Sequence, residues 1–132
     1  MESLNTNSAP RKQDTQAILT SILVESKALG AGLILDCGKV YESWPGFVPP
    51  NSNLIWKGIK NTFQALESQK LPCQLLEWRF ENFLVLAYLD AFRISGLVLN
   101  RQDTTRDLST LKSALGCPTN IEVRNLFEEN GG

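Results

Sequence analysis

Asp36, Glu77, Arg79 and Asp90 are the residues whose types and positions would suit acid–base or anion-binding chemistry. No histidine can act beside them as a general base, because the chain of 132 residues contains none. Histidine is the commonest general base near neutral pH and the commonest metal ligand, so every triad that depends on it is excluded. We therefore interpret Asp36 and Asp90 as turn residues, and Glu77 with Arg79 as one solvated face of a strand.

The cysteines and glycines add no second route to chemistry. Cys37, Cys73 and Cys117 are odd in number, far apart and never spaced as Cys-x-x-Cys, which argues against a disulfide framework and a metal site. Gly30-Ala-Gly32 lacks the rest of a dinucleotide fingerprint, and no phosphate-binding loop of the Gly-x-x-x-x-Gly-Lys-Ser/Thr type occurs. The sequence predicts no catalytic residue, no cofactor and no metal, so an enzyme is the least favoured class.

Composition predicts one compact domain. Apolar residues make up 42% and charged residues 20%, which is enough apolar content for a core. The net charge of -1 argues against nucleic acid and anionic membranes, because both partners normally require a basic surplus. No signal-peptide pattern and no membrane-spanning apolar run is present, so we expect a cytoplasmic protein. Residues 1–13 are polar and predict a flexible N-terminal tail.

Hydrophobic periodicity predicts an α+β fold in the order α-β-β-α-β-β-β-α. A one-faced helix, capped by Asp14 and ended near Gly30, precedes a hairpin with a glycine turn. A second helix follows, then three strands joined by short turns, then a third helix capped by Asp103. The expected strands are 31–36, 39–44, 73–80, 83–89 and 92–99. The second and third helices are expected at 51–68 and 103–115. We expect a five-stranded antiparallel sheet with helices on its faces.

Two apolar features in this order suggest contacts with other proteins. The second helix carries a stripe of mostly small or uncharged residues, which would let another helix approach closely: Leu54, Gly58, Asn61 and Ala65. The loop 44–50 is rich in proline yet apolar, and loops that carry aromatic residues often bind partners. The candidate partner-binding residues are Trp44, Phe47, Val48 and Trp56. The alternative is that the loop rings fold back to cover the core, and that Trp56 is itself core.

The layout resembles the roadblock family of dynein-light-chain and longin-related scaffold proteins, as a divergent member. The resemblance lies in Ile18-Leu-Thr-Ser-Ile-Leu, in the hairpin from Ala31 to Tyr41 and in the short-turned strands from Leu75 to Leu99. It implies a roadblock-like, profilin-like domain over 14–116, which leaves 117–132 as a C-terminal extension. The extension could dock as a short strand or helix.

The resemblance also implies a function. Such proteins have no chemistry of their own and form homodimers through the second helix and the adjoining edge strand. In this sequence the strand adds Leu75 and Glu77 to the helix stripe as dimer-interface residues. The leading hypothesis is a homodimeric adaptor or scaffold that binds a protein partner, such as a small GTPase. The second is an assembly chaperone that captures a short peptide tail of a larger complex, and a third is a small-molecule sensor.

Overall fold

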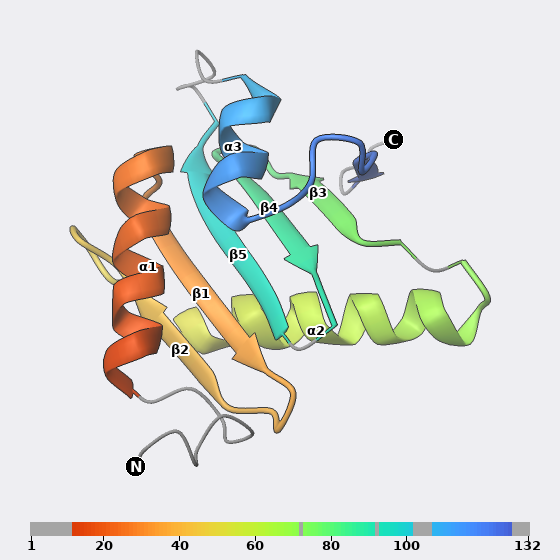
Figure 1. Ribbon diagram of the computed structural model, residues 1–132, viewed down its shortest axis with the longest axis horizontal. Coiled ribbons are helices and arrows are strands. Elements are labelled where there is room, and N and C mark those ends of the chain that lie inside the picture. The colour runs from red at the N-terminus through yellow and green to blue at the C-terminus, as the bar shows by residue number, and fades with distance from the viewer. Residues whose placement is uncertain (1–11, 72, 92, 102–106, 128–132) are drawn as a thin grey trace, which may run out of the picture.

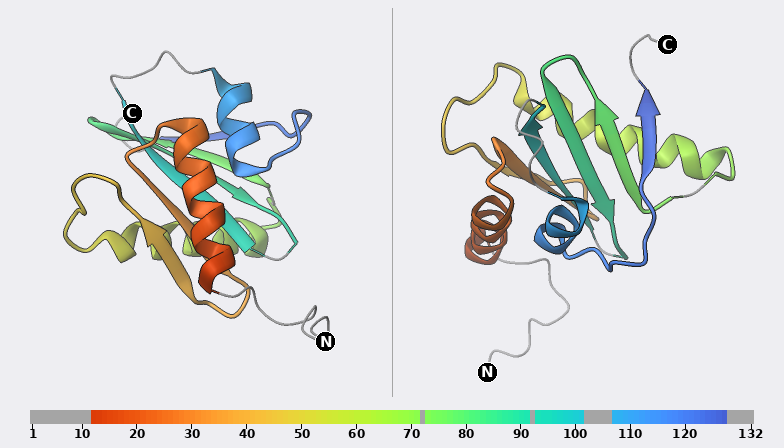
Figure 2. Two further views of the ribbon diagram at one scale, coloured as in Figure 1. Left: turned by 60° about the vertical axis from the view of Figure 1, so that its left-hand side comes forward. Right: turned by 90° about the horizontal axis from the view of Figure 1, so that it is seen from above.

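The computed structural model describes residues 12–71, 73–91, 93–101 and 107–127, which form three helices and one sheet of six strands. The strand order is β2-β1-β5-β4-β3-β6, with α1 and α3 on one face and α2 on the other (Figures 1 and 2). The elements are α1 (Lys12–Ser26), β1 (Gly30–Leu35), β2 (Val40–Ser43), α2 (Ser52–Ser68), β3 (Leu75–Arg79), β4 (Phe83–Leu89), β5 (Arg93–Asn100), α3 (Leu108–Leu115) and β6 (Arg124–Phe127).

The expected α+β class is confirmed, but the sheet has six strands rather than five and is not wholly antiparallel. The additional strand, β6, pairs in parallel with β3, whereas the other neighbouring strands pair antiparallel. Its four residues, Arg-Asn-Leu-Phe, begin with two polar side chains and follow no hairpin turn. Local pattern therefore carried too little signal to place this strand, and the long-range pairing with β3 decides it.

Helix ends also differ from the predicted ones. The structure ends α1 at Ser26, whose hydroxyl donates to the Ile22 carbonyl and accepts from the Ala28 amide. Gly30 consequently opens β1 instead of ending the helix. The α3 N-cap is Asp107, which accepts from the Thr110 amide, whereas the predicted cap Asp103 lies outside the described residues. Most of the expected tail 1–13 also lies outside them, and residues 12 and 13 belong to α1.

The core has two halves, one on each side of the sheet. The half under α1 and α3 includes Leu19, Leu86 and Leu111, and the half under α2 includes Phe63 and Val85. Alternate residues of β4 face opposite sides, so this apolar strand contributes to both halves. It lies between β3 and β5, as its two-faced apolar pattern predicted.

Trp56 attaches α2 to the sheet. Its side chain is 0% exposed and lies over Gly32 of β1 and Gly96 of β5, which are directly opposite each other in neighbouring strands. A Cβ atom on Gly32 would come within 2.7 Å of the indole ring, and one on Gly96 within 3.0 Å. The two glycines therefore provide the space in which the largest side chain of α2 is buried.

The polar edge of the Trp56 indole is bonded to Glu42 of β2. Glu42 Oε1 accepts from Trp56 Nε1 at 2.8 Å and from Trp44 Nε1 at 2.9 Å, while Oε2 accepts from Ser52 Oγ at 2.9 Å. Burial raises the pKa of this carboxyl, but the three donors outweigh that effect and hold the pKa below its ordinary value of 4.5. One carboxylate thus joins β2, the 44–50 loop and the start of α2.

The different surroundings of Gly32 and Gly58 predict opposite effects of alanine substitution on stability. Gly32→Ala should lower the free energy of unfolding by about 1–3 kcal/mol, because the added methyl overpacks the indole. Gly58→Ala, in α2, meets no heavy atom within 4 Å and should raise it by about 1 kcal/mol through helix propensity. Urea denaturation measures both, and a Gly32→Ala chain as stable as the unchanged protein would contradict the described packing.

The Glu42 hydrogen bonds predict a pH-dependent stability. Glu42→Gln removes the charged acceptor and should lower the free energy of unfolding by about 1–3 kcal/mol near pH 7. Because the folded pKa of Glu42 is depressed, its contribution is present above the unfolded value and is lost as pH falls through the folded pKa. The gap between unchanged chain and variant should therefore shrink below about pH 4.5. A gap that stayed constant from pH 7 to pH 3 would argue against a bonded carboxylate.

Candidate protein-interaction surface

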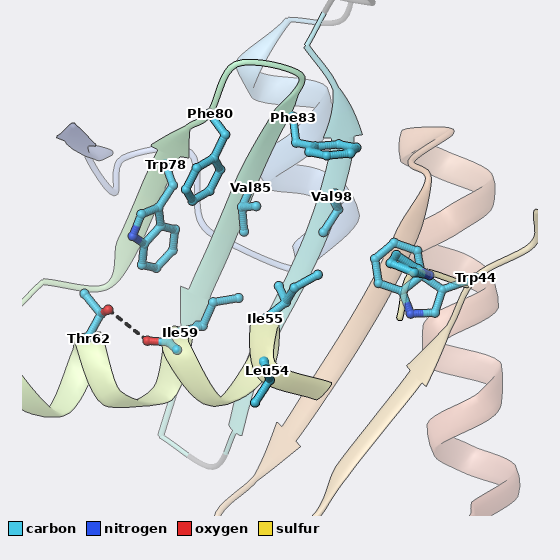
Figure 3. A pocket seen from close by; sticks show the side chains of 12 residues that line it. Trp44, Leu54, Ile55, Ile59, Thr62, Trp78, Phe80, Phe83, Val85 and Val98 are labelled. Atoms are coloured by element: carbon cyan, nitrogen blue, oxygen red, sulfur yellow. Dashed lines mark hydrogen bonds between the residues drawn. The ribbon is translucent and has the colours of Figure 1, made fainter. Parts of the chain in front are cut away.

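An open apolar groove runs between α2 and the sheet face formed by β3, β4 and β5, and its volume is about 430 Å³ (Figure 3). The side chains of α2 form one wall, the turn between β3 and β4 forms the other, and the 44–50 loop borders one end. The lining residues are Trp44, Pro49, Leu54, Ile55, Gly58, Ile59, Thr62, Trp78, Phe80, Phe83, Val85 and Val98.

The groove is suited to apolar groups. Thr62 is the one hydroxyl-bearing residue in the lining, and its Oγ1 donates to the Gly58 carbonyl at 2.8 Å. The indole nitrogen of Trp44 already bonds to Glu42. No cluster of convergent charged groups lies in the lining, which is the feature that orients polar small molecules in a binding site. The arrangement therefore fits apolar side chains of a protein better than a polar metabolite.

Exposed apolar residues extend this surface beyond the groove. Leu54, Phe80 and Phe83 line the groove and are themselves exposed, and Phe47 and Val48 lie in the bordering loop. Phe47 is the extreme case, with 79% of its surface exposed. Large exposed apolar patches mark interaction sites on soluble domains more often than isolated exposed apolar residues do.

The predicted partner-binding residues occupy three different environments. Trp44 is half-buried, packs against Gly30 and lies 6.1 Å from the Trp56 ring, so it covers the core and also borders the groove. Phe47 and Val48 are exposed. Trp56 is fully buried and contributes no surface to a partner, because the facing glycines of β1 and β5 let it sink into the core. Folding back onto the core is therefore true of Trp44 and not of Phe47, and the interpretation of Trp56 as a core residue is correct.

The predicted dimer-interface residues fall into an exposed group on α2 and a buried group on β3. Leu54, Gly58, Asn61 and Ala65 are all exposed on α2, and the Gly58 backbone has open space where a side chain would be. On β3, by contrast, Leu75 and Glu77 are buried. The outer edge of β3 that was to carry the interface is paired with β6. The described fold thus leaves the helix part of the predicted interface open and covers the strand part.

Sequence reasoning missed the far wall of the groove. Trp78 lies within β3, and Phe80 and Phe83 lie on either side of the turn Glu81-Asn82 that joins β3 to β4. The available signal was a pair of phenylalanines on either side of a two-residue polar turn, where solvent-facing residues are usual. Only the path of α2 across the same sheet face, on the other side of Val85 and Val98, shows that they share a groove with the helix (Figure 3).

The candidate chemical groups differ in how far the structure agrees with their predicted roles. The prediction that Glu77 and Arg79 form a solvated strand face is wrong for Glu77, which is buried, because β6 pairs along β3 and Asn125 bonds to its carboxylate. Asp90 Oδ1 accepts from the Arg93 amide in the turn between β4 and β5, as predicted for a turn residue.

Burial raises the pKa of the Cys117 thiol, and it also raises that of Cys73, where the nearby Arg124 partly offsets the effect. Both thiols are therefore poor nucleophiles near neutral pH.

Two broader features were also absent from the described residues. They hold no group of three or more potential metal ligands. None of their helices combines the length and apolar character needed to cross a membrane.

The comparisons with known proteins bear on the fold. No family model matches the sequence, and no curated protein matches it either. Solved structures do match: MglB with a tetrameric arrangement has 19% identity and a TM-score of 0.65, covering 77% of this chain and 79% of that one. A gliding protein, MglB, from Thermus thermophilus has 17% identity and a TM-score of 0.63, covering 77% of this chain and 80% of that one.

Myxococcus xanthus MglB matches with 5% identity and a TM-score of 0.61, covering 81% of this chain and 89% of that one. Identities this low concern the arrangement of the backbone. The roadblock-like fold expected from the sequence pattern is confirmed, and the chain has the fold of the MglB structures.

Proposed function

We propose that this chain is a non-catalytic adaptor that forms a homodimer through α2 and binds a protein partner along the apolar groove. The observation that carries the proposal is the continuous apolar surface made by the groove and its exposed rim. A soluble domain rarely leaves such a surface uncovered unless another molecule binds there. The missing histidine and the raised thiol pKa of the buried Cys117 agree with a protein that binds rather than catalyses.

The helix part of the dimer is supported by the exposed face of α2. Leu54, Gly58, Asn61 and Ala65 project from this face, and none of them carries a charge. Gly58 lies within the face with no atom over it, so the backbone of a second helix could approach closely there. Glycine in a helix interior costs about 1 kcal/mol relative to alanine, a cost that close helix packing would offset.

A small GTPase is the partner class implied by the roadblock resemblance, and the likeness to MglB structures is of the same fold. A folded partner of this kind would cover an extended area. It would contact the groove and also the protruding Phe47 and Val48 of the 44–50 loop. Aromatic residues at the centre of such interfaces commonly carry much of the binding energy.

An assembly chaperone that captures a peptide tail is the second candidate, and the groove itself favours it. A groove of about 430 Å³ lined by four aromatic side chains can take a few apolar side chains of a short segment. The two candidates use the surface differently, since a short peptide would fill the groove and leave Phe47 outside. Substitutions in the groove and in the loop therefore separate them.

The dimer is tested by adding bulk to α2. Gly58→Leu should weaken self-association about tenfold or more, equivalent to about 1.4 kcal/mol, because the new side chain separates the two helices. The fold should persist, since nothing lies within 4 Å of the added Cβ. The control is Gln64→Leu, which places the same apolar side chain, with little change in volume, at an exposed position about 120° away around the helix. Light scattering across a dilution series measures both, and equal dimer strength in the two variants would refute the helix contact.

The partner site is tested by titrating labelled protein with purified small GTPases and, separately, with peptide tails of complex subunits. Phe80→Ser should weaken binding of either partner by about 1 kcal/mol or more, because it removes an aromatic wall of the groove. Phe47→Ser should weaken binding of a folded partner alone. Both side chains are exposed, so unfolding is not expected from either change. Unaltered affinity of both variants would show that the groove is not the binding site.

A further inference from the structure

The segment after α3 is held by a buried lysine. Lys112 is only 8% exposed, and its ammonium donates to the Thr119 carbonyl at 3.0 Å and also to the Ile121 carbonyl. Burying a charged group costs free energy unless its hydrogen bonds are made, so these carbonyls and the ammonium stabilise one another. Ile121 and Val123 then pack against the core under α1 and α3. The chain is thereby directed from α3 to the edge of the sheet.

At that edge, β6 fills the outer side of β3. Residues 124–127 pair with 76–79, and the Asn125 side-chain amide donates to the carboxylate of Glu77. Glu77 is 8% exposed, so Asn125 satisfies a carboxylate that β6 itself helps to bury. On the opposite face, Leu126 stands beside Trp78 and packs with the core under α2. Both faces of this short strand are thus matched to β3.

Without β6, β3 would be an edge strand with unpaired backbone groups and buried-type side chains such as Leu75 and Leu76. Exposed edges of this kind pair readily with a strand of another chain. The edge that β6 presents instead is four residues long and begins with the exposed, polar Arg124 and Asn125. Short, polar edge strands are a common protection against unwanted pairing.

We propose that β6, which residues 119–123 direct to the sheet edge, forms an internal cap that closes β3 to strand pairing by a second copy of this chain. Self-association of the intact chain then runs through α2 without joining the two sheets. Releasing the cap opens a second contact, in which the β3 strands of two copies pair edge to edge. The statement about the intact chain rests on the proposed α2 homodimer. The statement about β3 does not, because opening β3 would promote association even if the intact chain is a monomer.

The cap is short enough to come away from the sheet without unfolding it. Arg124 and Asn125 are exposed, and parallel pairing is slightly less stable per residue than antiparallel pairing. The lysine anchor and the packed Ile121 and Val123 all lie before β6 in the chain. A chain that ends after Val123 therefore keeps these contacts and loses β6 together with residues 128–132.

The test compares the full chain with the chain ended after Val123 by sedimentation equilibrium over a dilution series. Removal of β6 should strengthen self-association at least about tenfold, or produce a dimer where the full chain is a monomer. The added association should survive Gly58→Leu, because it uses the sheet edge. Equal self-association of the full and shortened chains, with matching circular dichroism spectra, would overturn the proposal.

A point variant covers the case in which the shortened chain fails to fold. Asn125→Pro removes a backbone N–H and the bond to Glu77 within the full chain, while the exposed Glu122→Gln just before β6 is its control. The proline variant should associate more strongly than the control and exchange its β3 amide protons faster. Faster exchange without stronger association would overturn the proposal. If the full chain is a monomer and dimerises only when β6 is released, the proposal is supported and the α2 homodimer is refuted.

Discussion

The burial of Trp56 over two paired glycines, with its indole nitrogen bonded to Glu42, is the constraint on which the rest of this structure depends. Gly32 and Gly96 face each other across β1 and β5, and only their missing side chains leave room for the ring. The same carboxylate holds Trp44 and Ser52, so one group fixes the start of α2 and the loop before it. Trp56 thus anchors this end of α2, and the buried Ile59 and Phe63 hold the rest of the helix along the sheet (Figure 1).

The apolar groove follows from this path of α2. Anchored through Trp56 over β1 and β5, α2 crosses the sheet face at a distance from the turn of β3 and β4 and leaves an open groove between them (Figure 3). Core-type residues line the space, yet Phe80 and Phe83 on its rim remain exposed. A surface of this kind costs solubility, and a second molecule that covers it removes the cost. The interaction surface and the core are therefore products of one packing arrangement.

Local pattern predicted the order of the elements through α3 because helix and strand periodicities were clear there, as in the two-faced apolar strand β4. It did not place Trp56, which lay at the margin of the helix stripe, since the space for its ring comes from glycines on two strands distant in sequence. For a similar reason, the sequence left open whether the C-terminal extension docks as a strand or as a helix, and did not identify β6 as a partner of β3. Its partner β3 lies more than 40 residues earlier, and nothing local specifies a parallel pair.

Amide hydrogen exchange at low and high protein concentration tests the central claim most directly, because it locates the contact as well as detecting it. The account predicts that raising the concentration slows exchange in α2, around Gly58, while α1 and α3 are unchanged. Addition of a bound partner should then protect the turn between β3 and β4. Protection confined to the α1 and α3 face, or none at any concentration, would contradict the assignment of α2 and its groove as the interaction surface.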